Sequence, residues 1–277
     1  MPQPSTTQLR RLTSQFHELT SASDRTATRF LKVANYKLPE ALDAYYAAVG
    51  ESRKPSQLEG NLNSLFDSLR DTKIDGRDQM ELESTMDYLG NKLGVSLENA
   101  ELFVALELVQ APAIGEITRQ GFVDGWKLVP LQDASIDGQA AYVKTAINSL
   151  AEDTTLFKKV YRHAFISGRE RDQKALSLEN AMIYWGMLFS EPGMAWVSEN
   201  YNWLELWTQF LNEKWTRSVS KDMWNMALEF GLKAMDDETL SFWTEDGAWP
   251  GVIDDFVEWC RERGIGKEEA MEVDKNA

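Results

Sequence analysis

The sequence of 277 residues contains a single cysteine, Cys260, and only two histidines, His17 and His163. One cysteine excludes an intramolecular disulfide and a zinc cluster built on cysteine pairs. The histidines lie far apart and outside any motif with metal-ligand spacing, so we expect no metal and no cofactor. Cys260 lies on the apolar side of an expected helix, which favours a buried hydrophobic role over that of a nucleophile.

Long apolar runs are also missing. No run approaches the ~20 residues of a membrane-spanning helix, and the first residues, MPQPSTTQLRR, contain no apolar signal segment. Pro2 excludes N-myristoylation, which requires glycine there. The sequence has no glycine-rich phosphate loop and no nucleophile paired with a histidine. We therefore expect an intracellular protein, cytoplasmic, nuclear or both, that binds no membrane and has no catalytic residue.

Positive charge is scarce towards the C-terminus. The formal net charge of the chain is −15, and between Lys221 and Ala277 six Lys and Arg residues stand against 15 Asp and Glu residues. A negative surface attracts a basic partner and repels phosphates, so nucleic acid is not an expected partner. Residues 1–55, with eight basic and five acidic residues, are mildly basic instead.

Strand patterns are scarce as well, because beyond residue 60 apolar residues recur at helical rather than alternating spacing. We predict an all-α protein with a small three-helix domain at 7–49, a polar linker at 50–60, a larger helical domain at 61–264 and an acidic disordered tail at 265–277. The helices expected in the larger domain are Leu62–Leu69, Gln79–Leu93, Leu97–Val109, Thr118–Lys127, Gly138–Leu150, Leu156–Ile166, Leu178–Phe189, Trp203–Lys214, Asp222–Leu232 and Pro250–Arg263.

One five-residue word, SLENA, occurs twice, at Ser96–Ala100 and Ser177–Ala181. Each serine is expected to cap a helix, and the repetition suits two related helix-loop-helix halves. Asp71–Gly76 resembles the opening of a calcium-binding loop, but Lys73 and Leu82 occupy places that require oxygen ligands. We therefore expect degenerate EF-hand-like halves without a calcium ion.

The most informative stretch runs from Ser220 to Arg263. Ser220 is expected to cap a helix that begins with Lys221 and Asp222. In the last helix of the stretch, acidic residues lie opposite an apolar stripe, and this arrangement suits both a solvated face and a docking patch. The stripe consists of Trp249, Val252, Ile253, Phe256, Val257 and Cys260, and the acidic arc of Asp254, Asp255, Glu258 and Glu262.

The motifs SKDMWN and EDGAWPGVIDDFVEW resemble the signature of the defective-in-cullin-neddylation family, and the resemblance covers nearly the whole chain. It implies a C-terminal potentiating-neddylation domain preceded by a domain similar to ubiquitin-associated domains. In that family an Asp, an Ala and an Asp hold the C-terminal winged-helix subdomain of a cullin. Matched motif by motif, these residues are Asp222, Ala248 and Asp254.

The resemblance also implies a hydrophobic pocket for the N-acetylated initiator methionine of the neddylation conjugating enzyme. Such a pocket needs apolar walls and a polar group for the acetyl-amide, which Tyr184 could supply. Apolar residues at helical spacing equally suit a plain core, so both interpretations stay open. The matching residues are Met86, Leu102, Phe103, Ala105, Leu106, Gly115, Ile117, Tyr184 and Met187.

The function implied by the resemblance is that of a scaffold-type ligase component, which brings a cullin and the conjugating enzyme together without a covalent step of its own. The alternative is a ubiquitin-binding adaptor, with LTSASD as a contact loop, although Ser21, Ala22 and Ser23 replace the usual Met-Gly-Phe-like residues. Ubiquitin, the ubiquitin-like modifier and the cullin-bound RING protein are further candidate partners. A hydrolase site at Asp254, Asp255 and Glu258 would lack an adjacent cleft or metal partner.

Overall fold

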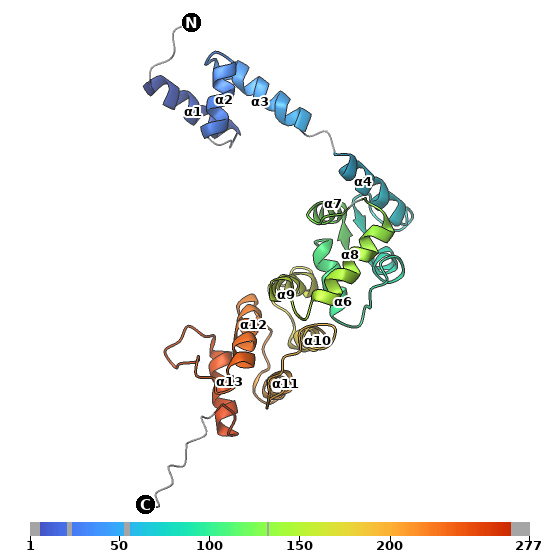
Figure 1. Cartoon of the computed structure of the whole chain (residues 1–277), viewed down its shortest axis with the longest axis vertical. Helices are drawn as coiled ribbons and strands as arrows, with labels where there is room; N and C mark the ends of the chain where they lie inside the picture. Colours follow the sequence, from blue (N-terminus) through green and yellow to red (C-terminus); the bar gives the residue numbers. More distant parts are fainter. Residues whose placement is uncertain (1–5, 21–23, 53–55, 132, 267–277) are drawn as a thin grey trace, which may run out of the picture. The chain divides into compact units, whose positions relative to one another are not determined.

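The computed structural model describes residues 6–20, 24–52, 56–131 and 133–266 (Figure 1). The chain divides into two compact units, residues 1–60 and 61–277. Within the described residues, no helix is long and apolar enough to cross a membrane. The all-α class predicted from the sequence is confirmed, with one small sheet added to the helices.

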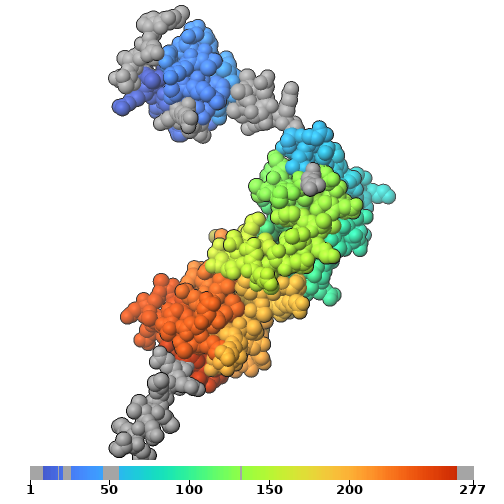
Figure 2. All heavy atoms as spheres, in the orientation of Figure 1, coloured from blue at the N-terminus to red at the C-terminus, as the bar shows by residue number. Residues whose placement is uncertain are grey.

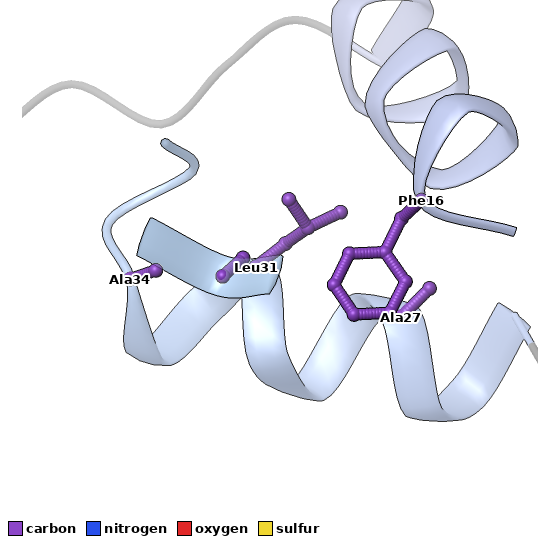
Figure 3. Packing of buried hydrophobic residues seen from close by; sticks show 5 residues of the cluster. Phe16, Ala27, Leu31 and Ala34 are labelled. Atoms are coloured by element: carbon purple, nitrogen blue, oxygen red, sulfur yellow. The ribbon is translucent and has the colours of Figure 1, made fainter. Parts of the chain in front are cut away.

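The first unit contains α1 (Thr6–Thr20), α2 (Asp24–Val33) and α3 (Leu38–Ser52). Its core is small: Phe16 of α1 points towards Ala27 and Leu31 of α2 (Figure 3), and all three are fully buried. The ring of Tyr45 from α3 meets the Phe16 ring edge-on at a centroid distance of 5.4 Å. The three predicted helices are therefore present, whereas the loop residues 21–23 lie outside the described residues.

The boundary between the units falls within α4, which opens the first of two helix-strand-helix segments whose strands pair. β1 pairs antiparallel with β2, with Met80 opposite Ile117. The expectation of a helix from Gln79 is therefore wrong at its start, because Gln79 and Met80 form a strand before the helix begins at Leu82. The elements are α4 (Gln57–Leu69), β1 (Gln79–Met80), α5 (Leu82–Met86), the wider π-type turn η1 (Asp87–Lys92), α6 (Ala100–Leu108), β2 (Ile117–Thr118), α7 (Arg119–Lys127) and α8 (Ile136–Ser149).

A similar arrangement follows in the remainder of the unit, where an isolated antiparallel bridge joins Leu176 to Val219 just before two helices begin. Each half of the unit therefore contains two helix-loop-helix segments tied by a short backbone pairing. The likeness of these halves to EF-hands stays a prediction. The helices are α9 (Thr154–Gly168), α10 (Leu178–Leu188), α11 (Trp203–Lys214), α12 (Lys221–Asp236) and α13 (Gly251–Glu262).

α9 connects the two halves, because it packs on α6 in one and on α12 in the other (Figure 1). The rings of Tyr161 and Trp224 stack with centroids 4.5 Å apart. The Trp185 ring stacks on the Trp224 indole at 5.0 Å. The Tyr161 hydroxyl donates to the Trp224 carbonyl at 2.8 Å and accepts from Trp185 Nε1 at 2.7 Å. Satisfied polar atoms and stacked rings together hold α9, α10 and α12 in one arrangement.

The two copies of SLENA start their helices differently. Ser177 caps α10, since its hydroxyl accepts from the Asn180 amide at 3.1 Å. The expectation that Ser96 caps α6 is wrong: Asn99 is the cap, and its side chain accepts from the Glu101 amide at 2.9 Å.

The boundaries of the predicted linker and tail fall partly outside the described residues. α3 continues to Ser52 and α4 begins at Gln57, so helices occupy both ends of the segment 50–60. Of the predicted tail, residues 267–277 lie outside the description. The domain limits given above therefore stay predictions.

Candidate functional site

Asp222 lies in the first turn of α12 and is exposed. The helix begins where expected, because the Ser220 hydroxyl accepts from the Met223 amide at 3.1 Å. Two residues after Asp222, the Trp224 indole donates to the Tyr161 carbonyl at 2.9 Å, which fixes this end of α12 against α9. The helix dipole favours a carboxylate in the first turn. Asp222 is therefore an exposed carboxylate on a helix end that is fixed against α9.

Asp254 lies in the first turn of α13 and is half-buried. Its Oδ1 accepts a hydrogen bond from the indole Nε1 of Trp243 at 2.9 Å. The Trp243 ring is itself nearly buried and carries the Arg261 guanidinium over its face, 4.6 Å from the ring centroid. The carboxylate is therefore oriented by a neighbour that the sequence analysis did not single out.

Asp237 orders the start of the loop between α12 and α13, which carries Trp243. This carboxylate accepts from the backbone amides and hydroxyls of both Thr239 and Ser241. The Thr239 hydroxyl and then the Ser241 hydroxyl lower the pKa of Asp237 below its ordinary value. Hydrogen bonds to the Asp237 carboxylate therefore order this part of the loop.

Ala248 is exposed at the end of this loop, next to Trp249. The Trp249 ring packs edge-on against Phe230 of α12, with centroids 5.9 Å apart, and Phe230 also meets Phe256 of α13 at 5.6 Å. Aromatic contacts therefore connect the loop, α12 and α13.

Trp249, the neighbour of Ala248, therefore packs near the middle of α12. Phe256, two residues after Asp254, packs against Phe230 as well. Asp222 lies eight residues before Phe230 on the same helix, which is about 12 Å along the axis at the usual helical rise. A standard docking surface of roughly 800 Å² per partner is wide enough to span that separation. The apolar stripe of α13 is buried as predicted, except for the half-buried Trp249. In the acidic arc, Asp254 is half-buried rather than exposed and accepts a hydrogen bond from Trp243.

The second candidate site, for an acetylated methionine, consists largely of core residues. Phe103, Ala105, Leu106 and Ile117 are fully buried, and Leu102 is nearly so. A ligand would reach these side chains only if their neighbours moved. Three members remain half-buried and more accessible: Met86, Tyr184 and Met187.

Two contacts order this region. The rings of Phe103 in α6 and Tyr184 in α10 meet edge-on at 5.2 Å, which brings those two helices together. Burial raises the pKa of the Tyr184 hydroxyl, whose closest acceptor is the Gly168 carbonyl at 3.4 Å. Gly115 has φ +89°, and a Cβ there would lie 2.6 Å from Leu82 Cδ1, so only glycine suits the turn. Met86 lines a separate cavity of about 630 Å³ beside Leu97.

The side chains that the sequence offered for covalent or metal chemistry, Cys260, His163 and Asp75, are buried or hydrogen-bonded. Cys260 is fully buried, and burial raises the pKa of its thiol to about 12, so the nucleophilic thiolate does not form near neutral pH. Burial lowers the pKa of His163, whose Nε2 lies 3.0 Å from the Ala111 carbonyl oxygen. Asp75 in the calcium-like loop accepts from the amides of Asp71 and Glu81. Among the described residues, no group of three or more His, Cys, Asp or Glu could hold a metal ion.

Comparison with known proteins defines two kinds of domain in the chain. Residues 10–52 match a family model described as a UBA-like domain, and residues 138–259 match one described as Cullin binding. The second match includes Asp222, Ala248 and Asp254.

Three relatives extend the likeness beyond these domains. The chain is similar to Defective in cullin neddylation protein 1 of Pyricularia oryzae, with 45% identity over 98% of this chain and 99% of the relative. It is 28% identical to the protein of the same name in Yarrowia lipolytica, over 88% of this chain and 93% of the relative. It is 31% identical to DCN1-like protein 4 of Danio rerio, over 64% of this chain and 59% of the relative. The chain belongs to the defective-in-cullin-neddylation family.

Proposed function

We propose that this protein promotes the neddylation of cullins as a non-covalent scaffold. Asp222, Ala248 and Asp254 bind the C-terminal winged-helix subdomain of a cullin. A site beside Tyr184 and Met187 binds the acetylated N-terminus of the conjugating enzyme. The protein then raises the effective concentration of the two reactants and orients them, with no covalent step on its own residues.

The observation that carries this proposal is the support given to the acidic residues. Asp222 stands in the first turn of a helix fixed by Trp224, and Asp254 is oriented by the Trp243 indole. Side chains that are already ordered lose little conformational entropy when a partner binds. The acidic balance of residues 221–277 favours a basic cullin surface, and the names of the relatives and the Cullin binding match point to the same partner.

The absence of a usable nucleophile among the residues discussed above supports the non-covalent mechanism. Cys260 is buried and its thiol pKa is about 12, so it is unsuited to carry a thioester. Asp255 and Glu258 are exposed, while Asp254 is engaged by an indole, an arrangement that favours docking over hydrolysis.

The test is a double charge reversal, Asp222→Lys with Asp254→Lys. Loss of paired charges from a docking surface costs about 2–5 kcal/mol, so affinity for the isolated winged-helix subdomain should fall by more than about 30-fold. Titration calorimetry measures the affinity, and cullin neddylation rates should fall with it at subsaturating concentrations. The matched control is Asp137→Lys with Glu179→Lys, which places the same charges in the exposed first turns of α8 and α10.

Equal binding by the charge-reversed and control variants would refute the docking assignment, provided circular dichroism finds both folded. The conjugating-enzyme site is tested without altering this chain: the acetylated N-terminal peptide of that enzyme should bind at least tenfold more tightly than the unacetylated peptide. Equal affinities would exclude acetyl-methionine recognition.

Ubiquitin binding by the first unit is a second candidate function, favoured by the UBA-like match over residues 10–52. Ubiquitin binding that survives the charge reversal would place it on a different surface.

A further inference from the structure

A short hairpin at residues 196–203 connects α10 to α11. An isolated antiparallel bridge joins Val197 to Asn202 within it. Its base is fixed against α12: Trp196 is fully buried, and a Cβ at Gly231 of α12 would lie only 2.9 Å from the Trp196 indole Cε2. The hairpin is therefore a supported element, although its tip is exposed.

The tip of the hairpin is bonded to the start of the loop between α12 and α13. The Asn200 backbone amide donates to Glu238 Oε1 at 2.7 Å, and the Asn200 side-chain Nδ2 donates to Glu238 Oε2 at 2.8 Å. Hydrogen bonds from the Asn200 amide, the Ser198 hydroxyl and the Asn200 side chain lower the pKa of the Glu238 carboxyl. The hairpin thus holds both oxygens of an ionised carboxylate.

A short path of contacts leads from Glu238 to the proposed docking residue Asp254. The turn that follows Glu238 is ordered by Asp237, and the buried Leu240 within it accepts from the Trp243 amide at 3.1 Å. The Trp243 indole then donates to Asp254. Trp243 lies only five residues after Glu238. Since a hydrogen-bonded turn tends to open as a unit, release of Glu238 should loosen the indole as well.

We propose that Asn200 is a positioning residue for cullin binding. By holding Glu238, it fixes the loop that carries Trp243 and so orients Asp254, without touching the cullin itself. The inference rests on the docking role proposed above for Asp254. An oriented side chain loses less conformational entropy when the partner binds, and this is the gain in affinity that the hairpin provides.

The first experiment is Asn200→Asp, which places a like charge against Glu238 and breaks the contact by repulsion. We expect affinity for the isolated winged-helix subdomain of a cullin, measured by calorimetry, to fall about threefold. The loss is modest because Asn200 is exposed and water competes for its bonds. An added negative charge would instead favour a basic partner if charge alone decided binding. Unchanged or higher affinity would therefore overturn the proposal.

The second experiment restores the contact by exchanging the two side-chain chemistries. Asn200→Asp with Glu238→Gln has the same net charge as the natural chain. The introduced amide can donate to the introduced carboxylate, and its oxygen can accept from the backbone amide of residue 200. Affinity should return to within about 1.5-fold of the original value, and failure to recover would contradict the positioning role. Glu199→Gln, at the exposed neighbouring position, is the control and should leave affinity unchanged. A loss there would mean that the tip touches the cullin directly.

A third measurement asks whether Asn200 acts through Trp243. In the free protein, hydrogen exchange at the Trp243 indole Nε1 should be at least threefold faster in Asn200→Asp, because the bond to Asp254 opens more often. In a Trp243→Phe background, Asn200→Asp should change cullin affinity by less than about 1.5-fold, since residues in one network are not additive. A full threefold loss in that background would refute the route through Trp243.

The double charge reversal separates this inference from the proposed function. Loss of binding in Asp222→Lys with Asp254→Lys, together with unchanged binding in Asn200→Asp, would overturn only the positioning role of Asn200. Unchanged binding in the charge reversal would overturn the docking assignment and the positioning role with it.

Discussion

Two tryptophans in the C-terminal region make the same pair of contacts around different carboxylates. Trp243 donates to Asp254 and lies under Arg261, while Trp259 donates to Glu213 Oε2 at 2.8 Å and lies under Arg263, 3.8 Å from its ring centroid. Both indoles are nearly buried. The Glu213 carboxylate also accepts from the Arg263 guanidinium at 2.8 Å. Only the first site includes a residue of the proposed docking surface.

This pairing allows the orientation of Asp254 to be tested separately from stability. Trp243→Phe removes the indole donor but keeps an aromatic ring, and it should lower the free energy of unfolding by about 1 kcal/mol. Because Asp254 then rotates more freely, cullin affinity should fall roughly threefold to tenfold, as measured by calorimetry.

Trp259→Phe is the control, since it should cost similar stability and leave cullin affinity unchanged. Equal losses of affinity in the two variants would mean that the first acts through general stability and does not position Asp254.

At the level of single residues, the sequence identified candidates but not their neighbours. The motif match assigned Asp254, yet the indole that orients it lies 11 residues earlier in a loop with no helical periodicity. Side-chain partners of this kind depend on how the loop folds back, which local spacing does not encode. The available signal was the tryptophan itself, because a buried indole usually requires a partner for its N–H group.

Helix starts are the next scale, and the repeated word SLENA illustrates how context selects a cap. In the first copy Asn99 caps α6, and in the second Ser177 caps α10. Both residue types are good caps, so propensity alone does not choose between them. In the first copy, the Glu101 carboxylate accepts from the Ser96 amide at 2.8 Å, so the residues before Asn99 form a turn rather than the helix itself.

The identity of each cap can be measured with a set of four alanine substitutions. Asn99→Ala and Ser177→Ala should each lower the free energy of unfolding by about 1 kcal/mol, the usual cost of losing a cap. Ser96→Ala and Asn180→Ala, at the alternative positions of the same word, should each cost less than about 0.5 kcal/mol. Urea unfolding followed by tryptophan fluorescence reports all four. A larger cost for Ser96→Ala than for Asn99→Ala would contradict the assigned cap.

Helices were largely predictable because long periodic segments carry a strong signal. The segment near Gln79 was not, since two-residue strands are too short to alternate, and β1 exists only because β2 lies opposite it. The candidate pocket was ambiguous for a related reason. Periodicity marks Phe103, Ala105 and Leu106 as buried but does not distinguish a core from a ligand-lined wall.

For the whole molecule, the two units differ in their means of stabilisation. Among the described residues of the first unit, the buried core consists of Phe16, Ala27, Leu31, Ala34 and Ala41. All ten tryptophans of the chain lie beyond residue 60, and in the second unit their rings form much of the core. A small core leaves little surplus stability, so the first unit should be the weaker of the two.

Leu31→Ala tests whether the units unfold independently. Truncating this fully buried leucine should cost about 2–5 kcal/mol, which exceeds or nearly exhausts the stability expected of so small a unit. Circular dichroism should lose the signal of the first three helices, while the midpoint of unfolding followed by tryptophan fluorescence, which reports only the second unit, should stay unchanged. Cullin affinity should be retained as well, because Asp222, Ala248 and Asp254 all lie in the second unit. A matching shift of the fluorescence midpoint would instead require that the two units unfold together, and the proposed cullin-binding residues would then depend on a core more than 170 residues away in the sequence.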